Sequence, residues 1–167
     1  METIKYGLDE LITKGGIYRG VRGSTPREVL AELIGVLSPS MSVGKMPAAT
    51  MPAAKLLEAV LEREALMSTG IGGGIALPHP RNPIFLSESD QYTALAFLER
   101  PVSWNSLDGE QVDTLFLIVS ASAKQHLQTL SEINYFCRME NFHRLLKKRA
   151  SLEELLSFIK ETEKNWK

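Results

Sequence analysis

The stretch that decides the fold is Ser68-Thr69-Gly70-Ile71-Gly72-Gly73-Gly74-Ile75-Ala76-Leu77-Pro78-His79, residues 68–79. Four of the five residues in 70–74 are glycines, and glycine adopts backbone conformations that strain other residues. The apolar run 75–77 then predicts a short strand. Pro78 has a fixed φ and no amide donor, so it presents the next side chain from a stiff backbone. We therefore expect a glycine turn, then a strand with an exposed His79 at its end.

The glycine-rich stretch does not match the common phosphate-binding loops. In the pattern G-x-G-x-x-G, Ile75 stands where the last glycine would be. The other pattern, G-x-x-x-x-G-K-[ST], needs a lysine, and none follows here. Nucleotide binding is therefore not predicted. Taken alone, these glycines are better explained by a flexible turn.

Helix and strand patterns alternate on both sides of this stretch. Apolar runs predict strands at 17–21, 93–98 and 114–120, the last buried on both faces. Helices are predicted from Thr25-Pro26-Arg27-Glu28, over 53–66, and after the capping boxes at 122–125 and 151–154. This order predicts an α/β fold, a mixed β-sheet flanked by helices on both faces, as a three-layer single domain over residues 1–167. Prolines and glycine make 39–52 a loop, and residues 1–16 match no recognisable element.

The composition is that of an ordinary globular chain, whose partners must be recognised by local surface features rather than by its net charge. Of 167 residues, 44% are hydrophobic and 23% charged, and the net charge is -1. No positive field would therefore draw the chain to nucleic acid. The sequence has one cysteine and no apolar run long enough for a membrane span. We expect a cytoplasmic protein without membrane insertion.

His79 is the side chain with the clearest chemical potential. Imidazole is a good nitrogen nucleophile whose ordinary pKa lies near cellular pH, so it can accept a phosphoryl group and release it. A single histidine is, however, more often a packing or surface residue. Further residues are needed before a role can be assigned.

Those residues lie before and after the glycine stretch. Leu61-Glu62-Arg63-Glu64 followed by residues 68–79 resembles the phosphorylation motif of IIA domains of the phosphotransferase system, of the fructose, mannitol and nitrogen-regulatory class. The chain also resembles later segments of that family, in the same order, at Pro101-Val102-Ser103-Trp104, Asp108-Gly109, the strand 115–119 and Gln125-His126-Leu127. The resemblance covers roughly residues 17–160, nearly the whole chain, as one domain of ordinary size.

The resemblance implies a histidine phosphocarrier. His79 would be the phosphoryl acceptor, His126 its partner across the site and Arg63 the nearby cation. A guanidinium can hydrogen-bond the oxygens of a transferring phosphoryl group in a fork. His126 lies in the first turn of a capped helix, where free amides favour an anion. The donor would be a small histidine phosphocarrier protein, and the next partner a IIB domain or a regulatory target protein. No cofactor and no metal are implied.

Each of these assignments has an alternative from the residues alone. Arg63 could be a solvated helix residue paired with Glu62 or Glu64, and His126 could be structural. The chain could also be a regulatory binding module without onward transfer, or a hydrolase with His79 as general base. We assign no role to His143, interpret Cys137 as a structural apolar residue, and find no zinc-ligand spacing among the histidines and the cysteine.

Overall fold

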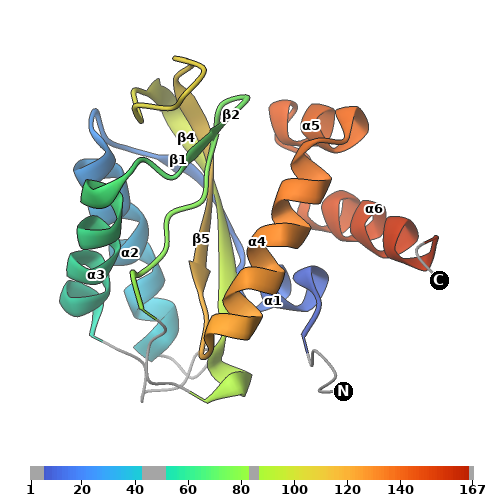
Figure 1. Ribbon diagram of the computed structural model, residues 1–167, viewed down its shortest axis with the longest axis horizontal. Helices are drawn as coiled ribbons and strands as arrows, with labels where there is room; N and C mark the ends of the chain where they lie inside the picture. The colour runs from blue at the N-terminus through green and yellow to red at the C-terminus, as the bar shows by residue number, and fades with distance from the viewer. Residues whose placement is uncertain (1–5, 43–51, 83–86, 166–167) are drawn as a thin grey trace.

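The protein has three layers, with one sheet between two groups of helices (Figure 1). The computed structural model describes residues 6–42, 52–82 and 87–165. Within these residues the sheet has five strands: β1 (Ile17–Val21), β2 (Gly70–Gly72), β3 (Ile75–Ala76), β4 (Tyr92–Val102) and β5 (Val112–Val119). The helices are α1 (Leu8–Gly15), α2 (Pro26–Ser42), α3 (Ala53–Leu66), α4 (Ala123–Cys137), α5 (Glu140–Lys147) and α6 (Leu152–Lys164), with a 3-10 turn at Glu88–Asp90.

The sheet is mixed, as predicted. Its order is β1-β4-β5-β3-β2. The β1–β4 and β3–β5 pairs are parallel, whereas β4–β5 and β2–β3 are antiparallel. Helices α2 and α3 cover one face, and α1, α4, α5 and α6 cover the other (Figure 1). The fold class predicted from the sequence is therefore confirmed.

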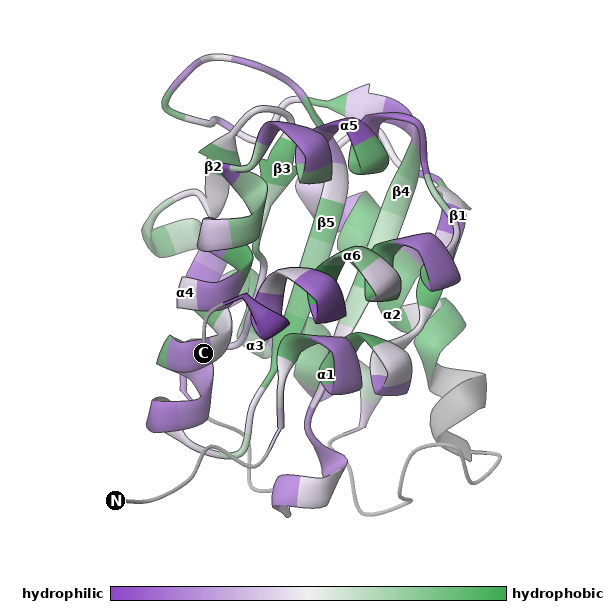
Figure 2. Cartoon of the chain, turned by 90° about the vertical axis from the view of Figure 1, so that its right-hand side faces the viewer, coloured by the Kyte–Doolittle hydropathy of each residue, from purple (hydrophilic) through white to green (hydrophobic). Residues whose placement is uncertain are grey.

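Two hydrophobic cores lie on the two faces of the sheet. Alternate residues of β4 point to opposite sides, so that Ala94 and Ala96 join the core under α2 and α3, while Leu95 and Phe97 join the core under the other helices. All four are fully buried. β5 alternates in the same way, and both central strands are apolar along most of their length (Figure 2). The predicted burial of β5 on both faces is confirmed.

The helix starts follow the predicted capping signals. The Oγ of Ser122 accepts a hydrogen bond from the amide of Gln125, and that of Ser151 from the amide of Glu154, both at 3.1 Å. The Oγ1 of Thr25 accepts from the amide of Glu28 at 3.2 Å. Each cap satisfies a backbone donor that the first helical turn would otherwise leave free.

The prediction for residues 39–52 was wrong at its start. Helix α2 continues through Pro39 to Ser42, because a proline removes one backbone hydrogen bond without necessarily ending the helix. Residue 52 lies directly before α3, and residues 43–51 lie outside the described part of the chain.

The N-terminal segment, to which no element was assigned, contains helix α1. Leu8, Leu11 and Ile12 are buried in it. At its end Gly15 approaches the backbone of β4, where an added Cβ would lie 2.0 Å from the carbonyl oxygen of Thr93. Only glycine allows this helix to dock so closely on the sheet.

The glycine stretch forms the predicted turn and also one strand more than predicted. β2 and β3 pair as a hairpin. The last residue of β2 and the two turn glycines that follow it have positive φ, at +94° for Gly72, +63° for Gly73 and +81° for Gly74. Among the described residues, no helix is both long enough and apolar enough to cross a membrane.

Candidate functional site

The segment that follows β3, to which His79 belongs, runs between helices α3 and α4 (Figure 1). Its backbone is held from both sides. The amide of Leu77 donates to the carbonyl oxygen of Thr69, and the amide of Ile118 in β5 donates to that of Pro78, both at 3.0 Å. These two bonds extend the sheet beyond the end of β3 at Ala76. His79 therefore projects from a backbone with little freedom to shift.

His79 is buried rather than exposed, which corrects the expectation from the sequence. Its relative accessibility is 8%. The ring nitrogen Nδ1 lies 2.7 Å from the carbonyl oxygen of Leu77. A carbonyl can only accept, so Nδ1 carries the proton in this bond, and in the neutral ring the lone pair is then on Nε2.

His126 faces His79 from the first turn of α4. The two ring centroids lie 4.5 Å apart and the ring planes are inclined by 51°. The amide of His126 donates to the carbonyl oxygen of Ser122 at 3.1 Å, which fixes its backbone in the capped turn. The structure thus brings together two histidines that are 47 residues apart in the sequence (126 − 79).

Arg63 contributes the positive charge of the site. It lies half-buried near the end of α3, and its Nη1 donates to the carbonyl oxygen of Met67 at 2.7 Å. Its charge lowers the pKa of both His79 and His126. All three site residues predicted from the sequence therefore lie within electrostatic reach of one another.

Burial and charge keep both imidazoles neutral. For His79, burial lowers the pKa, the bond to the Leu77 carbonyl partly opposes this, and Arg63 lowers it further. For His126, burial, His79 and Arg63 together lower the pKa to about 4. At neutral pH the site therefore holds two uncharged rings and one fixed guanidinium, which suits an incoming anion.

A cavity of about 200 Å³ adjoins His126. It is lined by residues 80–82, by the end of β5 and by the N-terminal part of α4, including Ala123 and Leu127. The exposed Arg81 adds a second positive charge at this opening. The site is thus open to a charged group on the His126 side.

The residue after Arg63 also belongs to the surroundings of the site. Glu64 accepts hydrogen bonds from Thr69, from the amide to Oε1 at 2.9 Å and from the hydroxyl to Oε2 at 2.6 Å. From the sequence, Glu64 was expected only as a possible ion-pair partner of Arg63. Its contact with Thr69 spans only five residues, but it depends on how the chain turns after the helix, and the adjacent Arg-Glu pair was its only signal in the sequence.

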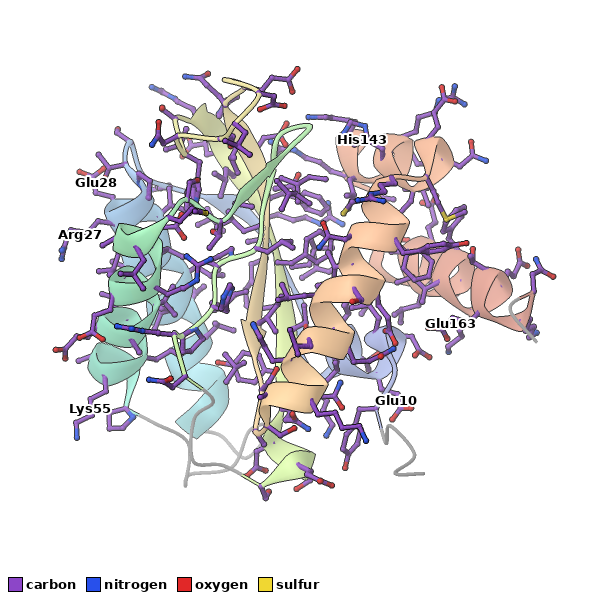
Figure 3. The ribbon with its side chains drawn as sticks, in the orientation of Figure 1. Glu10, Arg27, Glu28, Lys55, His143 and Glu163 are labelled. Atoms are coloured by element: carbon purple, nitrogen blue, oxygen red, sulfur yellow. The ribbon has the colours of Figure 1, made fainter. Side chains whose placement is uncertain are left out.

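His143 has a structural contact that the sequence did not predict. Its Nε2 lies 2.9 Å from the carbonyl oxygen of Gly73, so α5 holds the tip of the β2–β3 hairpin (Figure 3). On the other side of the hairpin, Asp108 accepts a hydrogen bond from the amide of Gly73 at 3.0 Å.

Burial raises the pKa of Cys137 to about 12, which makes this thiol a poor nucleophile. Within the described residues, no three histidine, cysteine or acidic side chains form a group that could hold a metal.

Comparison with known proteins agrees with this geometry. The family model described as "Phosphoenolpyruvate-dependent sugar phosphotransferase system, EIIA 2" matches residues 10–162. The chain belongs to this family. This membership confirms the resemblance noted from the sequence and makes the protein a IIA component of a system that transfers phosphoryl groups.

The curated relatives of this IIA chain include both nitrogen regulatory proteins and sugar-specific components of the phosphotransferase system. It is 36% identical over 119 residues to the nitrogen regulatory protein of Escherichia coli (strain K12), a match covering 68% of this chain and 70% of that protein. It is 27% identical over 161 residues to the fructose-specific EIIABC component of Bacillus subtilis (strain 168), covering 94% of this chain and 24% of that protein.

Solved structures share the fold at low sequence identity. The nitrogen regulatory protein IIA-Ntr from Neisseria meningitidis superposes with a TM-score of 0.67 at 23% identity, over 87% of this chain and 93% of that one. A putative phosphotransferase-system IIA domain from Streptococcus pyogenes gives a TM-score of 0.72 at 18% identity, over 95% and 97% of the two chains. These likenesses establish the three-layer IIA fold.

Proposed function

We propose that this IIA chain is a histidine phosphocarrier in which Nε2 of His79 accepts the phosphoryl group. The observation that carries the proposal is the bond from Nδ1 to the Leu77 carbonyl, at 2.7 Å. Because this bond keeps the proton on Nδ1, the lone pair on Nε2 is available for attack. The lowered pKa of His79 keeps the ring in this reactive neutral form at cellular pH.

The transfer needs only a donor that itself carries phosphohistidine. The lone pair of Nε2 attacks the phosphorus, a new N–P bond forms, and the N–P bond of the donor breaks. The electron pair of the broken bond returns to the donor imidazole. Such a transfer is an exchange between similar bonds, so the protein contributes mainly position and charge stabilisation.

Arg63 and His126 supply that stabilisation in this proposal. The guanidinium hydrogen-bonds the phosphoryl oxygens as negative charge spreads over them. His126, whose ring lies 4.5 Å from that of His79, donates a hydrogen bond to the same oxygens from its neutral ring. Neither residue needs to give up or take a proton, so the site is ready before the donor arrives.

The surface next to these residues suits a protein donor. Leu66 and Met67, which follow Arg63 at the end of α3, are 59% and 73% exposed, and Leu127, which follows His126, is 63% exposed. Single exposed apolar residues are common, but these three lie beside two site residues. This supports docking of a small histidine phosphocarrier protein as donor, and then of a IIB domain as acceptor.

The decisive experiment is phosphorylation with a defined relay. The protein is incubated with phosphoenolpyruvate, the first enzyme of the relay and the small phosphocarrier, and its intact mass is measured. One added phosphate, located on His79 by tandem mass spectrometry, supports the proposal. A wild-type chain that gains no phosphate from a relay active on other IIA domains would refute it.

A second candidate function is regulation by phosphorylation state without onward transfer. It is favoured by the 36% identity to a nitrogen regulatory protein. A phosphoryl group on His79 adds about two negative charges beside the exposed Leu66, Met67 and Leu127, which changes the affinity for any partner that binds there. Adding a purified IIB domain to the phosphorylated chain separates the two functions. Loss of the phosphate to IIB supports transfer, and a stable phosphorylated chain supports regulation.

A further inference from the structure

Glu64 occupies a position from which it controls the backbone that carries His79. Both of its carboxylate oxygens are bonded to Thr69, at 2.9 Å to the amide and at 2.6 Å to the hydroxyl. Thr69 is only 6% exposed, so neither of its donors finds an easy substitute in water. A charged acceptor that holds two donors of one residue is a strong local constraint.

The constraint passes from Thr69 to His79 through two further hydrogen bonds. The carbonyl oxygen of Thr69 accepts from the amide of Leu77 at 3.0 Å. The carbonyl oxygen of Leu77 in turn accepts from Nδ1 of His79 at 2.7 Å. Glu64 is thus three hydrogen-bonded steps from the ring, and the same Leu77 carbonyl fixes the ring's orientation and its tautomer.

We propose that Glu64 is a positioning residue for His79, acting through Thr69 and Leu77 to hold Nδ1 as the proton-bearing nitrogen. This inference rests on the proposed function, because it explains how the attacking Nε2 is kept in place. Glu64 touches neither His79 nor the incoming phosphoryl group, since both of its oxygens are committed to Thr69.

A change at Glu64 should also affect the neighbouring Arg63. Arg63 donates to the carbonyl oxygen of Met67 at 2.7 Å, so consecutive residues of α3 bind both ends of the turn 67–69. Loosening Thr69 therefore displaces the acceptor of the Arg63 guanidinium as well as the Leu77 carbonyl. A displacement of about 1 Å at reacting atoms can cost roughly 100-fold in rate.

The test uses four variants of the whole chain. Glu64→Gln has only one acceptor oxygen for the two Thr69 donors, and Thr69→Val removes the hydroxyl while preserving shape and the amide. Thr69→Ser retains both donors and is the rescuing variant. Glu58→Gln is the matched control, because Glu58 is an exposed carboxylate on the same helix.

Two readouts are measured on each variant. The first is the rate of phosphorylation of His79 by phosphoramidate, a small donor that needs no protein docking. The second is the exchange rate and chemical shift of the His79 imidazole Nδ1 proton by nitrogen-edited NMR, which needs no phosphoryl transfer. All measurements are made well below the thermal midpoint of each variant, so that unfolding does not contribute.

Glu64→Gln is expected to lower the phosphorylation rate about tenfold or more and to speed exchange of the Nδ1 proton. Thr69→Val shifts both readouts in the same direction, whereas Thr69→Ser and Glu58→Gln match the wild type. Wild-type exchange in both Glu64→Gln and Thr69→Val would overturn the proposal, even if their rates fell. A wild-type chain that takes no phosphate would refute the proposed function, while the Nδ1 exchange would still test the positioning role.

Discussion

The imidazole rings of His79 and His126 face each other at a centroid distance of 4.5 Å. Of these two rings, only that of His79 is hydrogen-bonded to the backbone of the described residues, through Nδ1 to the Leu77 carbonyl. The two rings are therefore not equivalent. The bond to the Leu77 carbonyl fixes the tautomer of His79, whereas His126 is held through its backbone in the first turn of α4. This asymmetry suggests one nucleophile and one stabilising partner.

Replacing His79 by glutamine should abolish phosphorylation and leave the fold intact. The glutamine amide can still donate to the Leu77 carbonyl, so the free energy of unfolding should change by no more than about 1 kcal/mol. Intact mass after incubation with the relay and thermal unfolding check the two parts. His143→Gln is the matched control, since its amide can still reach the Gly73 carbonyl. Labelling of His79→Gln at the wild-type rate would show that another residue is the acceptor.

Replacing Arg63 should slow transfer according to how much of the guanidinium is lost. Arg63→Ala removes both the positive charge and the paired N–H donors of the guanidinium, so it should lower the rate of phosphoryl transfer about tenfold or more. Arg63→Lys retains the charge but cannot bind two oxygens in parallel, so its loss should be smaller. Single-turnover rates with the phosphocarrier donor provide the measurement, and Arg27→Ala on the outer side of α2 is the control (Figure 3). Equal rates for wild type and Arg63→Ala would remove Arg63 from the site.

The parts of the fold that were predictable from sequence are those with a local cause. The alternation along β4 and β5, and the serines that cap α4 and α6, each depend on residues a few positions apart. Helix α1 does carry a local signal, since Leu8, Leu11 and Ile12 stand at helical spacing, but eight residues are too few to predict a helix from that pattern alone. It is held in place by a contact between Gly15 and the backbone of β4, and that contact joins residues far apart in the sequence.

The candidate site likewise has features that the sequence predicts and features that depend on distant residues. The motif around residues 61–79 and the segment 125–127 sufficed to select Arg63, His79 and His126. The burial of His79 could not be predicted, because it depends on α3 and α4 closing over the end of β3. The hydrogen bond from His143 to Gly73 spans 70 residues, and a single histidine gives no sequence signal for such a contact.

The stability of the protein should depend on pH in opposite ways through His126 and Glu163. The pKa of His126 is lowered from 6.5 to about 4 by burial, His79 and Arg63. Between these values the unfolded chain binds a proton that the folded chain does not, so the free energy of unfolding falls as pH decreases from 6.5 to 4. After discounting for solvent screening of this half-buried ring, the contribution is on the order of 1–2 kcal/mol.

Glu163, on α6 away from the site (Figure 3), acts in the other direction. Burial and the carboxylates of Asp9, Glu132 and Glu10 raise its pKa from 4.5 to about 7. The contribution of Glu163 to the free energy of unfolding is fully present below pH 4.5 and is lost as pH rises to 7. In urea unfolding at pH 7 and 4.5, His126→Asn should therefore lose less stability on acidification than the wild type, and Glu163→Gln should lose more. The same pH dependence in all three proteins would contradict both assignments.

The roles of the two histidines can be separated by removing His126 alone. His126→Ala leaves the bond between His79 Nδ1 and the Leu77 carbonyl in place, so the attacking nitrogen and its tautomer are retained. What is lost is a ring that can donate to the phosphoryl oxygens, and with it stabilisation of the transition state rather than the nucleophile. We therefore expect His126→Ala to become phosphorylated on His79, but slowly, in contrast to His79→Gln, which takes no phosphate. Rates from single-turnover transfer and the position of the phosphate from tandem mass spectrometry decide between the roles. Phosphate on His126, or an inactive His126→Ala beside a phosphorylated His79→Gln, would reverse the assignment.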